Sequence, residues 1–146
     1  MIRLIDESFE SNGGLLVSPN LVEDIFKDKG WLESILDFER RDQQLKMSLA
    51  VKQALEREGN LVFEAGTGIG KSLAYLVPGI LHAKHSRRPC VVATNTINLQ
   101  EQLINKDIPK VRELFNGIPD YSSLAEFRCA LLVGRANYLC SSRLLH

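Results

Sequence analysis

The stretch that decides the fold is residues 65–72, which read Ala65-Gly66-Thr67-Gly68-Ile69-Gly70-Lys71-Ser72. Apart from Ala in its first position it matches a P-loop, a glycine-rich turn that ends in Lys and Ser or Thr. Glycines allow positive φ angles, so backbone N–H groups can converge on phosphate oxygens at the positive end of the next helix. We expect Lys71 to reach the β- and γ-phosphates of a nucleotide and Ser72 to bind Mg²⁺. The alternative is a glycine-rich turn that merely begins a helix.

The segments around this loop have the order that a P-loop requires. Residues 61–63 (Leu-Val-Phe) predict a short buried strand, and residues 71–85 are apolar enough for a mostly buried helix that Pro78 should kink. Residues 90–93 (Cys-Val-Val-Ala) predict a second buried strand. Strand, loop, helix and strand make a βαβ unit, which indicates a parallel sheet covered by helices.

Further elements are expected on both sides of this unit. Helical spacing of apolar residues predicts an amphipathic helix from Asp42 to near Gly59, and another at residues 99–105 that Pro109 limits. Residues 129–133 predict a third buried strand. Residues 1–37 alternate short apolar runs with polar breaks and indicate short helices or an extended lead-in.

Composition narrows the class of protein. The 146 residues are 45% hydrophobic and 25% charged, with 18 Lys+Arg against 18 Asp+Glu, as in one soluble globular domain. The longest apolar stretch, residues 73–81, falls well short of the ~20 residues that span a bilayer, so no membrane partner is expected. An acidic start argues against a secretory signal, so we expect the cytoplasm. Zero net charge requires any nucleic-acid site to be local.

The cysteines and histidines allow two interpretations. Cys90, Cys129 and Cys140 are too few and too widely spaced for a disulfide framework, which leaves buried thiols or a metal ligand. Cys90 and Cys129 lie inside apolar strand patterns and are expected to be small core residues. His82 and His85 could form a metal pair, but they also suit the negative end of a helix without a metal, which is our expectation.

Four segments together resemble one family. The Ala-x-Thr-Gly-x-Gly-Lys-Ser form of the loop resembles that of superfamily 2 helicases. Residues 38–47 resemble the segment ahead of the P-loop in DinG-type helicases, relatives of XPD, and match it at Arg41, Gln44 and Met47, although Asp42 stands where many members have Pro or Ala.

The other two segments lie downstream. Residues 91–109 are similar to motif Ia of the same group, whose strand end and helix start touch the backbone of single-stranded DNA. Residues 134–140 (Gly-Arg-Ala-Asn-Tyr-Leu-Cys) resemble the start of the group's iron–sulphur domain. The resemblance covers residues 38–140 in order.

The resemblance implies an α/β P-loop NTPase fold. It would be a partial RecA-like lobe with a mostly parallel sheet flanked by helices, preceded by a short helical lead-in. Residues 1–37 would be that lead-in, residues 38–139 the first part of the helicase ATP-binding lobe, and residues 140–146 the truncated start of the iron–sulphur domain.

The implied function is the N-terminal ATP-binding part of an ATP-dependent DNA helicase. Such an enzyme couples ATP hydrolysis to translocation on single-stranded or forked DNA, with 5′–3′ polarity and a place in DNA repair. The implied cofactors are ATP, Mg²⁺ and a [4Fe–4S] cluster whose first ligand would be Cys140. The candidate nucleotide-binding residues are Arg41, Gln44, Ala65, Gly66, Thr67, Gly68, Ile69, Gly70, Lys71 and Ser72, with Lys71 and Ser72 as the catalytic pair.

For the candidate residues outside the glycine-rich loop, the residue types alone leave more than one interpretation open. The carboxamide of Gln44 could donate to and accept from an adenine edge, and Arg41 has the fork for a phosphate or a carboxylate, but both could be solvated on the outside of a helix. The expected nucleic-acid contacts are Thr94, Asn95, Asn98 and Gln100, at the carboxyl end of a strand. Asn95, Thr96 or Asn98 could equally be a helix N-cap.

Two parts of a helicase motor do not occur in the sequence. There is no Asp-Glu-Ala-His box and no second RecA-like lobe. We therefore expect an N-terminal fragment that is inactive alone, marginally stable, and exposes apolar surface. The remaining alternatives are a non-helicase P-loop protein, such as a nucleotide kinase, and a non-catalytic nucleotide-binding fragment. The oligomeric state is left open.

Overall fold

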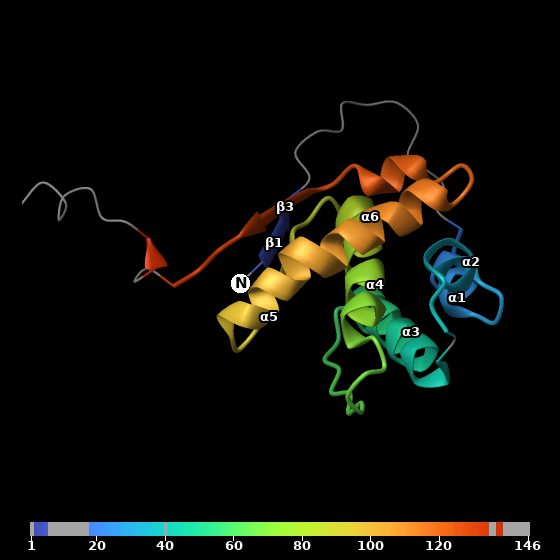
Figure 1. The fold of residues 1–146 in the computed structure, drawn as a ribbon, viewed down its shortest axis with the longest axis horizontal. Helices are drawn as coiled ribbons and strands as arrows, with labels where there is room; N and C mark the ends of the chain where they lie inside the picture. Colours follow the sequence, from blue (N-terminus) through green and yellow to red (C-terminus); the bar gives the residue numbers. More distant parts are fainter. Residues whose placement is uncertain (1, 6–17, 40, 135–136, 139–146) are drawn as a thin grey trace, which may run out of the picture.

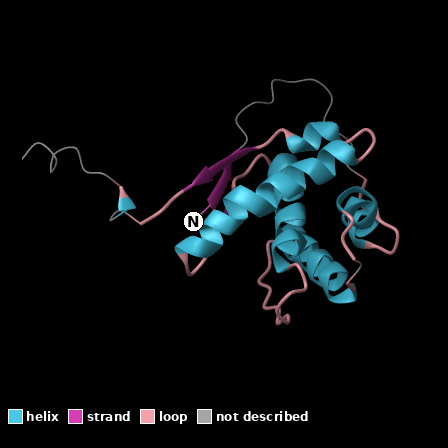
Figure 2. Cartoon of the chain, viewed as in Figure 1, coloured by secondary structure: helices cyan, strands magenta, loops and turns pink. Residues whose placement is uncertain are grey.

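The chain forms a helix-rich α/β structure (Figures 1 and 2). The computed structural model describes residues 2–5, 18–39, 41–134 and 137–138. In chain order the elements are β1 (Ile2–Ile5), α1 (Leu21–Phe26), α2 (Trp31–Leu36), α3 (Asp42–Glu56), α4 (Lys71–Ser86), β2 (Cys90–Val92), α5 (Ile97–Gln102), a π-helical turn (Leu103–Asp107), α6 (Ile108–Gly117), a short 3₁₀ helix (Ser122–Ala125) and β3 (Arg128–Leu131). Within the described ranges, no helix has the length and apolar character needed to cross a membrane.

Helix α4 lies at the centre of the core and confirms the helix expected at residues 71–85. It packs against α3 and α6, and its buried residues include Ala74, Val77 and Ile80, which are at most 1% exposed. The helix continues through Pro78. Close packing at its far end is visible at Gly79, where an added Cβ would lie 3.1 Å from Cys90 Sγ. The mostly buried helix therefore has the position that its composition predicts.

The short helices α1 and α2 confirm one of the two expectations for the lead-in. Ile25 and Phe26 of α1 and Leu32 of α2 are buried, and the two helices pack against α3 and α6 respectively. These side chains join the same core as α4, so residues 21–36 are part of the folded unit.

The expected end of a helix before Pro109 is wrong. Helix α5, the π-helical turn and α6 follow one another without a break from residue 97 to residue 117. Pro109 falls in the first turn of α6, where a missing N–H removes no essential hydrogen bond. The π-helical turn just before it shifts the hydrogen-bond ladder, so the chain continues where sequence rules predict a stop.

The sheet differs from the parallel sheet that was expected. The strands at residues 90–92 and 128–131 confirm the position of two of the expected strands in shorter form, with β1 between them in the order β2-β1-β3. Their expected burial is wrong, because Val91 is 49% and Leu131 is 39% exposed. Both pairings are antiparallel, with Ile2 opposite Val92 on one side and opposite Leu131 on the other. The prediction of a mostly parallel sheet is therefore wrong for the described strands, because the N-terminal segment separates β2 from β3.

The third expected strand, at residues 61–63, does not form in the described structure. A strand needs a hydrogen-bonding neighbour, and residues 61–63 pair with none of the strands of the described sheet, in which β2 and β3 are the edge strands. The side chains stay exposed, Val62 at 97%, Leu61 at 41% and Phe63 at 36%. The prediction of a buried strand at residues 61–63 is therefore wrong. The prediction that the chain exposes apolar surface is confirmed by the same residues.

Candidate nucleotide-binding site

The glycine-rich loop leads directly into α4. Gly68 has φ +82° and Gly70 has φ +78°, the left-handed region that favours glycine, and α4 begins at Lys71. A Cβ added at Gly66 or Gly68 would meet nothing within 4 Å. The backbone at both positions therefore borders open space, as a loop that receives phosphate oxygens requires.

The charges at this end of α4 suit an anion. The ammonium of Lys71 donates hydrogen bonds to the carbonyl oxygens of Ala65, at 3.0 Å, and Gly66, at 2.9 Å. The first turn of α4 contains no acidic residue, so nothing there neutralises the helix N-terminus. A phosphate oxygen accepts a stronger, charge-assisted bond than a carbonyl does. The loop thus holds Lys71 where an incoming phosphate can take over its bonds.

Gln44 reaches the loop from α3, whereas Arg41 does not. The Gln44 side chain is buried, at 3% exposed, and its Nε2 donates to the carbonyl oxygen of Gly70 at 2.9 Å. The structure thus excludes the interpretation of Gln44 as a solvated surface residue. Arg41 is exposed at the N-cap of α3 and makes no side-chain cap. Of the two residues ahead of the loop, Gln44 is the one that contacts it.

Sequence reasoning did not single out Tyr75, which follows Ser72 by three residues on α4, or Asp107, whose charge acts on Tyr75. Ser72 and Tyr75 are three residues apart on α4, so their side chains lie on one face of the helix. Burial raises the pKa of Tyr75 above its ordinary value of 10.0, the Ser72 hydroxyl lowers it, and the negative charge of Asp107 raises it. Asp107 is 8% exposed and lies 3.5 Å from Gln102 Nε2. The three-residue spacing of Ser72 and Tyr75 on an expected helix was the sequence feature that could have indicated that their side chains are neighbours.

The polar segment after β2 contains a helix cap. Thr96 is the N-cap of α5, and its hydroxyl accepts a hydrogen bond from the Leu99 N–H at 3.2 Å. The hydroxyl of Thr94 donates to the carbonyl oxygen of Thr96, also at 3.2 Å. Capping, one of the alternatives for this segment, is therefore confirmed for Thr96.

The remaining polar candidates differ in exposure. Asn95 and Asn98 are exposed at the start of α5, whereas Gln100 is buried at 8% exposed. A partner can reach the two asparagines directly. Gln100 faces the protein interior, so its side chain is placed to support the segment.

The described cysteines are not arranged as metal ligands. Cys90 and Cys129 are half-buried free thiols, and burial raises the pKa of both above the ordinary value of 9.0, although the charge of Arg112 lowers that of Cys129. Metal ligation requires thiolates, so these residues fit the expected role of small core side chains. Cys140 lies outside the described residues. In the part that the structure describes, no cluster of metal-ligating residues occurs, including around His82.

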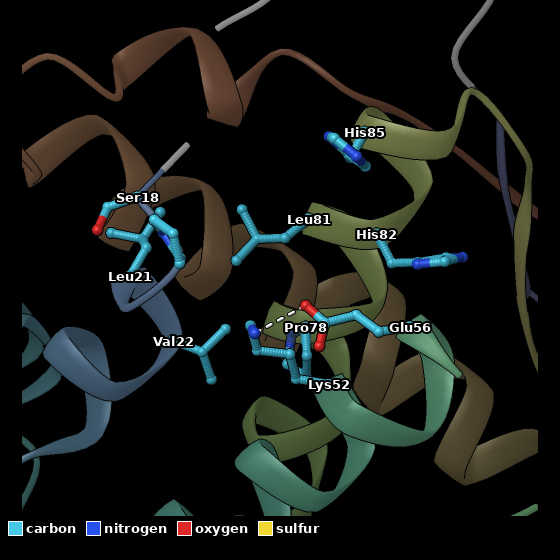
Figure 3. Close-up of a pocket in the computed structure, with 10 residues that line it drawn as sticks. Ser18, Leu21, Val22, Lys52, Glu56, Pro78, Leu81, His82 and His85 are labelled. Carbon is cyan, nitrogen blue, oxygen red and sulfur yellow. Dashed lines mark ion pairs between the residues drawn. The ribbon is translucent and has the colours of Figure 1, made fainter. Parts of the chain in front are cut away.

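A separate cavity of about 250 Å³ lies between α1, α3 and α4 (Figure 3). Apolar side chains such as Leu81 form its wall, and the ion pair of Lys52 Nζ with Glu56 Oε1, at 2.7 Å, lies at its edge. Its residues on α4 begin at Pro78, roughly 10 Å beyond Lys71 at ~1.5 Å per residue. None of its lining residues belongs to the glycine-rich loop, so this cavity is not the phosphate site.

Curated proteins with similar sequences are DNA helicases and a nuclease. The chain is 40% identical over 126 residues to "ATP-dependent DNA helicase YoaA" of Haemophilus influenzae, across 86% of this chain and 18% of the relative. It is 47% identical over 106 residues to "ATP-dependent helicase DinG" of Mycobacterium tuberculosis, across 72% of this chain and 15% of the relative. It is 34% identical over 113 residues to "3'-5' exonuclease DinG" of Bacillus subtilis, across 77% and 11%.

Two further comparisons gave no match. No protein-family model matches the chain, and no solved structure matches it. The chain spans less than a fifth of the length of these curated relatives. Since the identity nevertheless extends over most of the chain, this chain is a homologue of a part of the DinG and YoaA helicases.

Proposed function

We propose that this chain is the ATP-binding part of an ATP-dependent DNA helicase, with the glycine-rich loop as the phosphate site of a RecA-like lobe. The observation that carries the proposal is the loop itself. Gly68 and Gly70 adopt positive φ, the backbone borders open space, and Lys71 begins a helix whose first turn holds no acid. The names of the relatives support ATP as the nucleotide and DNA as the partner.

Each residue of the loop then has a role in binding ATP. The backbone N–H groups from Gly66 to Gly70 donate to phosphate oxygens, and Lys71 exchanges its carbonyl partners for the β- and γ-phosphates. Ser72 binds Mg²⁺, which neutralises charge on the phosphates. Gln44 holds the carbonyl of Gly70 through its amide nitrogen, and its carboxamide oxygen is proposed to accept from the adenine. Arg41 is exposed and does not contact the loop, so its proposed role is to meet a phosphate of the bound nucleotide.

The polar segment before and within α5 is the proposed DNA contact. Asn95 and Asn98 are exposed and suited to neutral hydrogen bonds with a phosphodiester backbone, which position a strand without reading its bases. Thr94 and Gln100 support these asparagines from the protein side. The Thr94 hydroxyl is hydrogen-bonded to the backbone carbonyl of Thr96, and the Gln100 side chain is buried. Single-stranded or forked DNA, 5′–3′ translocation and a place in DNA repair are part of this proposal.

The iron–sulphur cluster is proposed for the whole protein. Cys140 is its first candidate ligand, and a Cys₄ site needs further cysteines, which Cys90 and Cys129 do not supply because both are half-buried thiols. Iron analysis of the full-length protein with Cys140→Ser tests this assignment. Equal iron content in the variant and the wild type would contradict it.

The decisive experiment is nucleotide binding by the full-length protein with Lys71→Ala. We expect loss of ATP binding and of DNA-stimulated ATP hydrolysis with the overall fold retained, because the variant removes the cation proposed to face the phosphates. Lys46→Ala is the matched control, since Lys46 is an exposed lysine of α3. A folded Lys71→Ala protein that binds ATP as tightly as the control would refute the proposed site.

A further inference from the structure

The first turn of α5 presents apolar side chains to solvent beside the proposed DNA contacts. Residues 95–99 are all exposed, including Ile97 at 52% and Leu99 at 46%. Gln100 and Leu103, which follow them, are buried and anchor the helix to the body of the protein. Figure 1 shows α5 at one end of the helical run that includes α6, away from α1 and α2. The turn is therefore an anchored projection with a partly apolar outer surface.

Ile97 and Leu99 flank Asn98 on this projection. Successive residues of an α-helix are about 100° apart around its axis, so the three side chains point in different directions from one turn. The Thr96 hydroxyl accepts from the Leu99 N–H at 3.2 Å and holds the start of the helix in place. The exposed amide of Asn98, a candidate DNA contact, thus has an apolar side chain on each side.

The charges of this segment do not suit phosphate groups. Residues 89–105 contain no Lys or Arg, and Glu101, four residues after Ile97 on the same face of α5, is exposed and acidic. Lys and Arg side chains supply the salt-dependent attraction of a protein for phosphates. Leu and Ile, in contrast, are among the apolar side chains that insert between neighbouring bases. The side of α5 that bears Ile97 therefore favours bases over phosphates.

We propose that Ile97 and Leu99 contact the unpaired bases of a single strand whose phosphodiester backbone is held by Asn98. This inference rests on the proposed DNA contact of the same segment and names the part of the DNA that each side chain meets. The contact does not read sequence, because every base presents a face to an apolar side chain. Single-stranded DNA is thereby held through its bases at a place where the chain supplies no cation.

The test compares two fluorescent single strands of equal length in the full-length protein. One is oligothymidylate, and the other has the same sugar-phosphate backbone without bases. Ile97→Ala and Leu99→Ala should each bind oligothymidylate about fourfold more weakly than wild type, the effect of roughly one buried methylene group, and bind the abasic strand as wild type does. The slope of affinity against salt concentration should stay unchanged, because these variants remove no cation.

Val62→Ala is the matched control, because it also removes exposed apolar carbon, but from the segment before the loop. It should leave both affinities unchanged, whereas Asn98→Ala should weaken the binding of both strands equally. If Ile97→Ala binds both strands like wild type, or loses affinity equally for both, the base contact is refuted. If wild type binds neither strand, the proposed DNA contact itself is refuted.

Discussion

Alanine substitutions at three glycines of the loop should form a graded series. At Gly66 φ is not positive, and an added Cβ would meet open space. At Gly68 φ is +82°, and an added Cβ would again meet open space. At Gly70 φ is +78°, and an added Cβ would overlap the Gln44 side chain. The three positions therefore separate the cost of backbone conformation from the cost of a steric overlap. The order of stability should be Gly66→Ala, then Gly68→Ala, then Gly70→Ala.

The magnitudes follow from these local facts. Gly66→Ala should be within about 0.5 kcal/mol of wild type, as for surface changes without special features. Gly68→Ala must hold a non-glycine residue in the left-handed region, which costs about 1–2 kcal/mol. Gly70→Ala has the same conformational cost, and its Cβ would overlap Gln44 Nε2, so the bond from Nε2 to the Gly70 carbonyl is lost at about 1 kcal/mol more. The total for Gly70→Ala is roughly 2–3 kcal/mol.

Urea unfolding followed by circular dichroism measures these differences, and Gln44→Ala supplies the internal check. In the Gln44→Ala background the overlap is gone, so Gly70→Ala should cost no more than Gly68→Ala costs in the wild type. The two changes are in contact, and a double-mutant cycle should give a coupling of about 1 kcal/mol. Equal costs for Gly68→Ala and Gly70→Ala in the wild type, or a coupling of zero, would show that Gln44 does not hold the loop.

Other predictions concern the helix cap, the exposed segment and the thiols. Thr96→Ala should lower the free energy of unfolding by about 1 kcal/mol and Thr96→Ser by almost nothing in thermal melts, and equal losses would refute the cap. Val62→Lys should leave stability within about 0.5 kcal/mol and reduce self-association in sedimentation, because Val62 is 97% exposed, whereas a large loss of stability would show that Val62 is buried. In a Cys140→Ser background, Cys90 and Cys129 should react with iodoacetamide more slowly at pH 8 than free cysteine. Rapid alkylation at pH 8 would contradict the burial of these thiols. Because the pKa of both thiols is higher in the folded chain than in the unfolded chain, the unfolded chain loses these protons at lower pH, so the free energy of unfolding should fall as pH rises through about 9.

The helices were the more predictable part of the fold because their signals are local. Apolar spacing and the glycine-rich loop predicted α3 and α4 to within a few residues of their bounds. The failure at Pro109 has a local cause as well, since a proline in the first turn of a new helical segment and a proline that ends a helix look alike in sequence. A π-helical turn has no recognised sequence pattern here, so the continuity of residues 97–117 was not predictable.

The sheet was less predictable because strand pairing depends on distant segments. Residues 90–92 and 128–131 have the apolar character of strands, but nothing near them indicates that residues 2–5 lie between them. Residues 61–63 also have a strand-like composition, but they form no strand because they have no partner among the described strands. Composition thus predicted which segments favour extended structure, and only the fold shows which of them pair.

The candidate site was predictable in identity and less so in contacts. The loop, Lys71 and Ser72 follow from one pattern, but the role of Gln44 in the unliganded chain depends on how α3 packs on α4. Asp107 is a second example. It lies more than thirty residues after the loop, and its charge acts on Tyr75 because the π-helical turn packs against α4.

The loop is held mainly by helices. Before the loop in the sequence, residues 61–63 make no strand pairing within the described sheet. After the loop, α4 packs against α3 and α6. The bonds that cross the loop also come from the helical side, from Gln44 of α3 and from Lys71 at the start of α4. These contacts fix Gly70 and the start of α4 even though the preceding segment is unpaired in the described sheet. The conformation of the glycine-rich loop and the strand expected before it are thus separable in this chain, which is why a loop leading into α4 is present where the pattern predicts it and the strand at residues 61–63 is not.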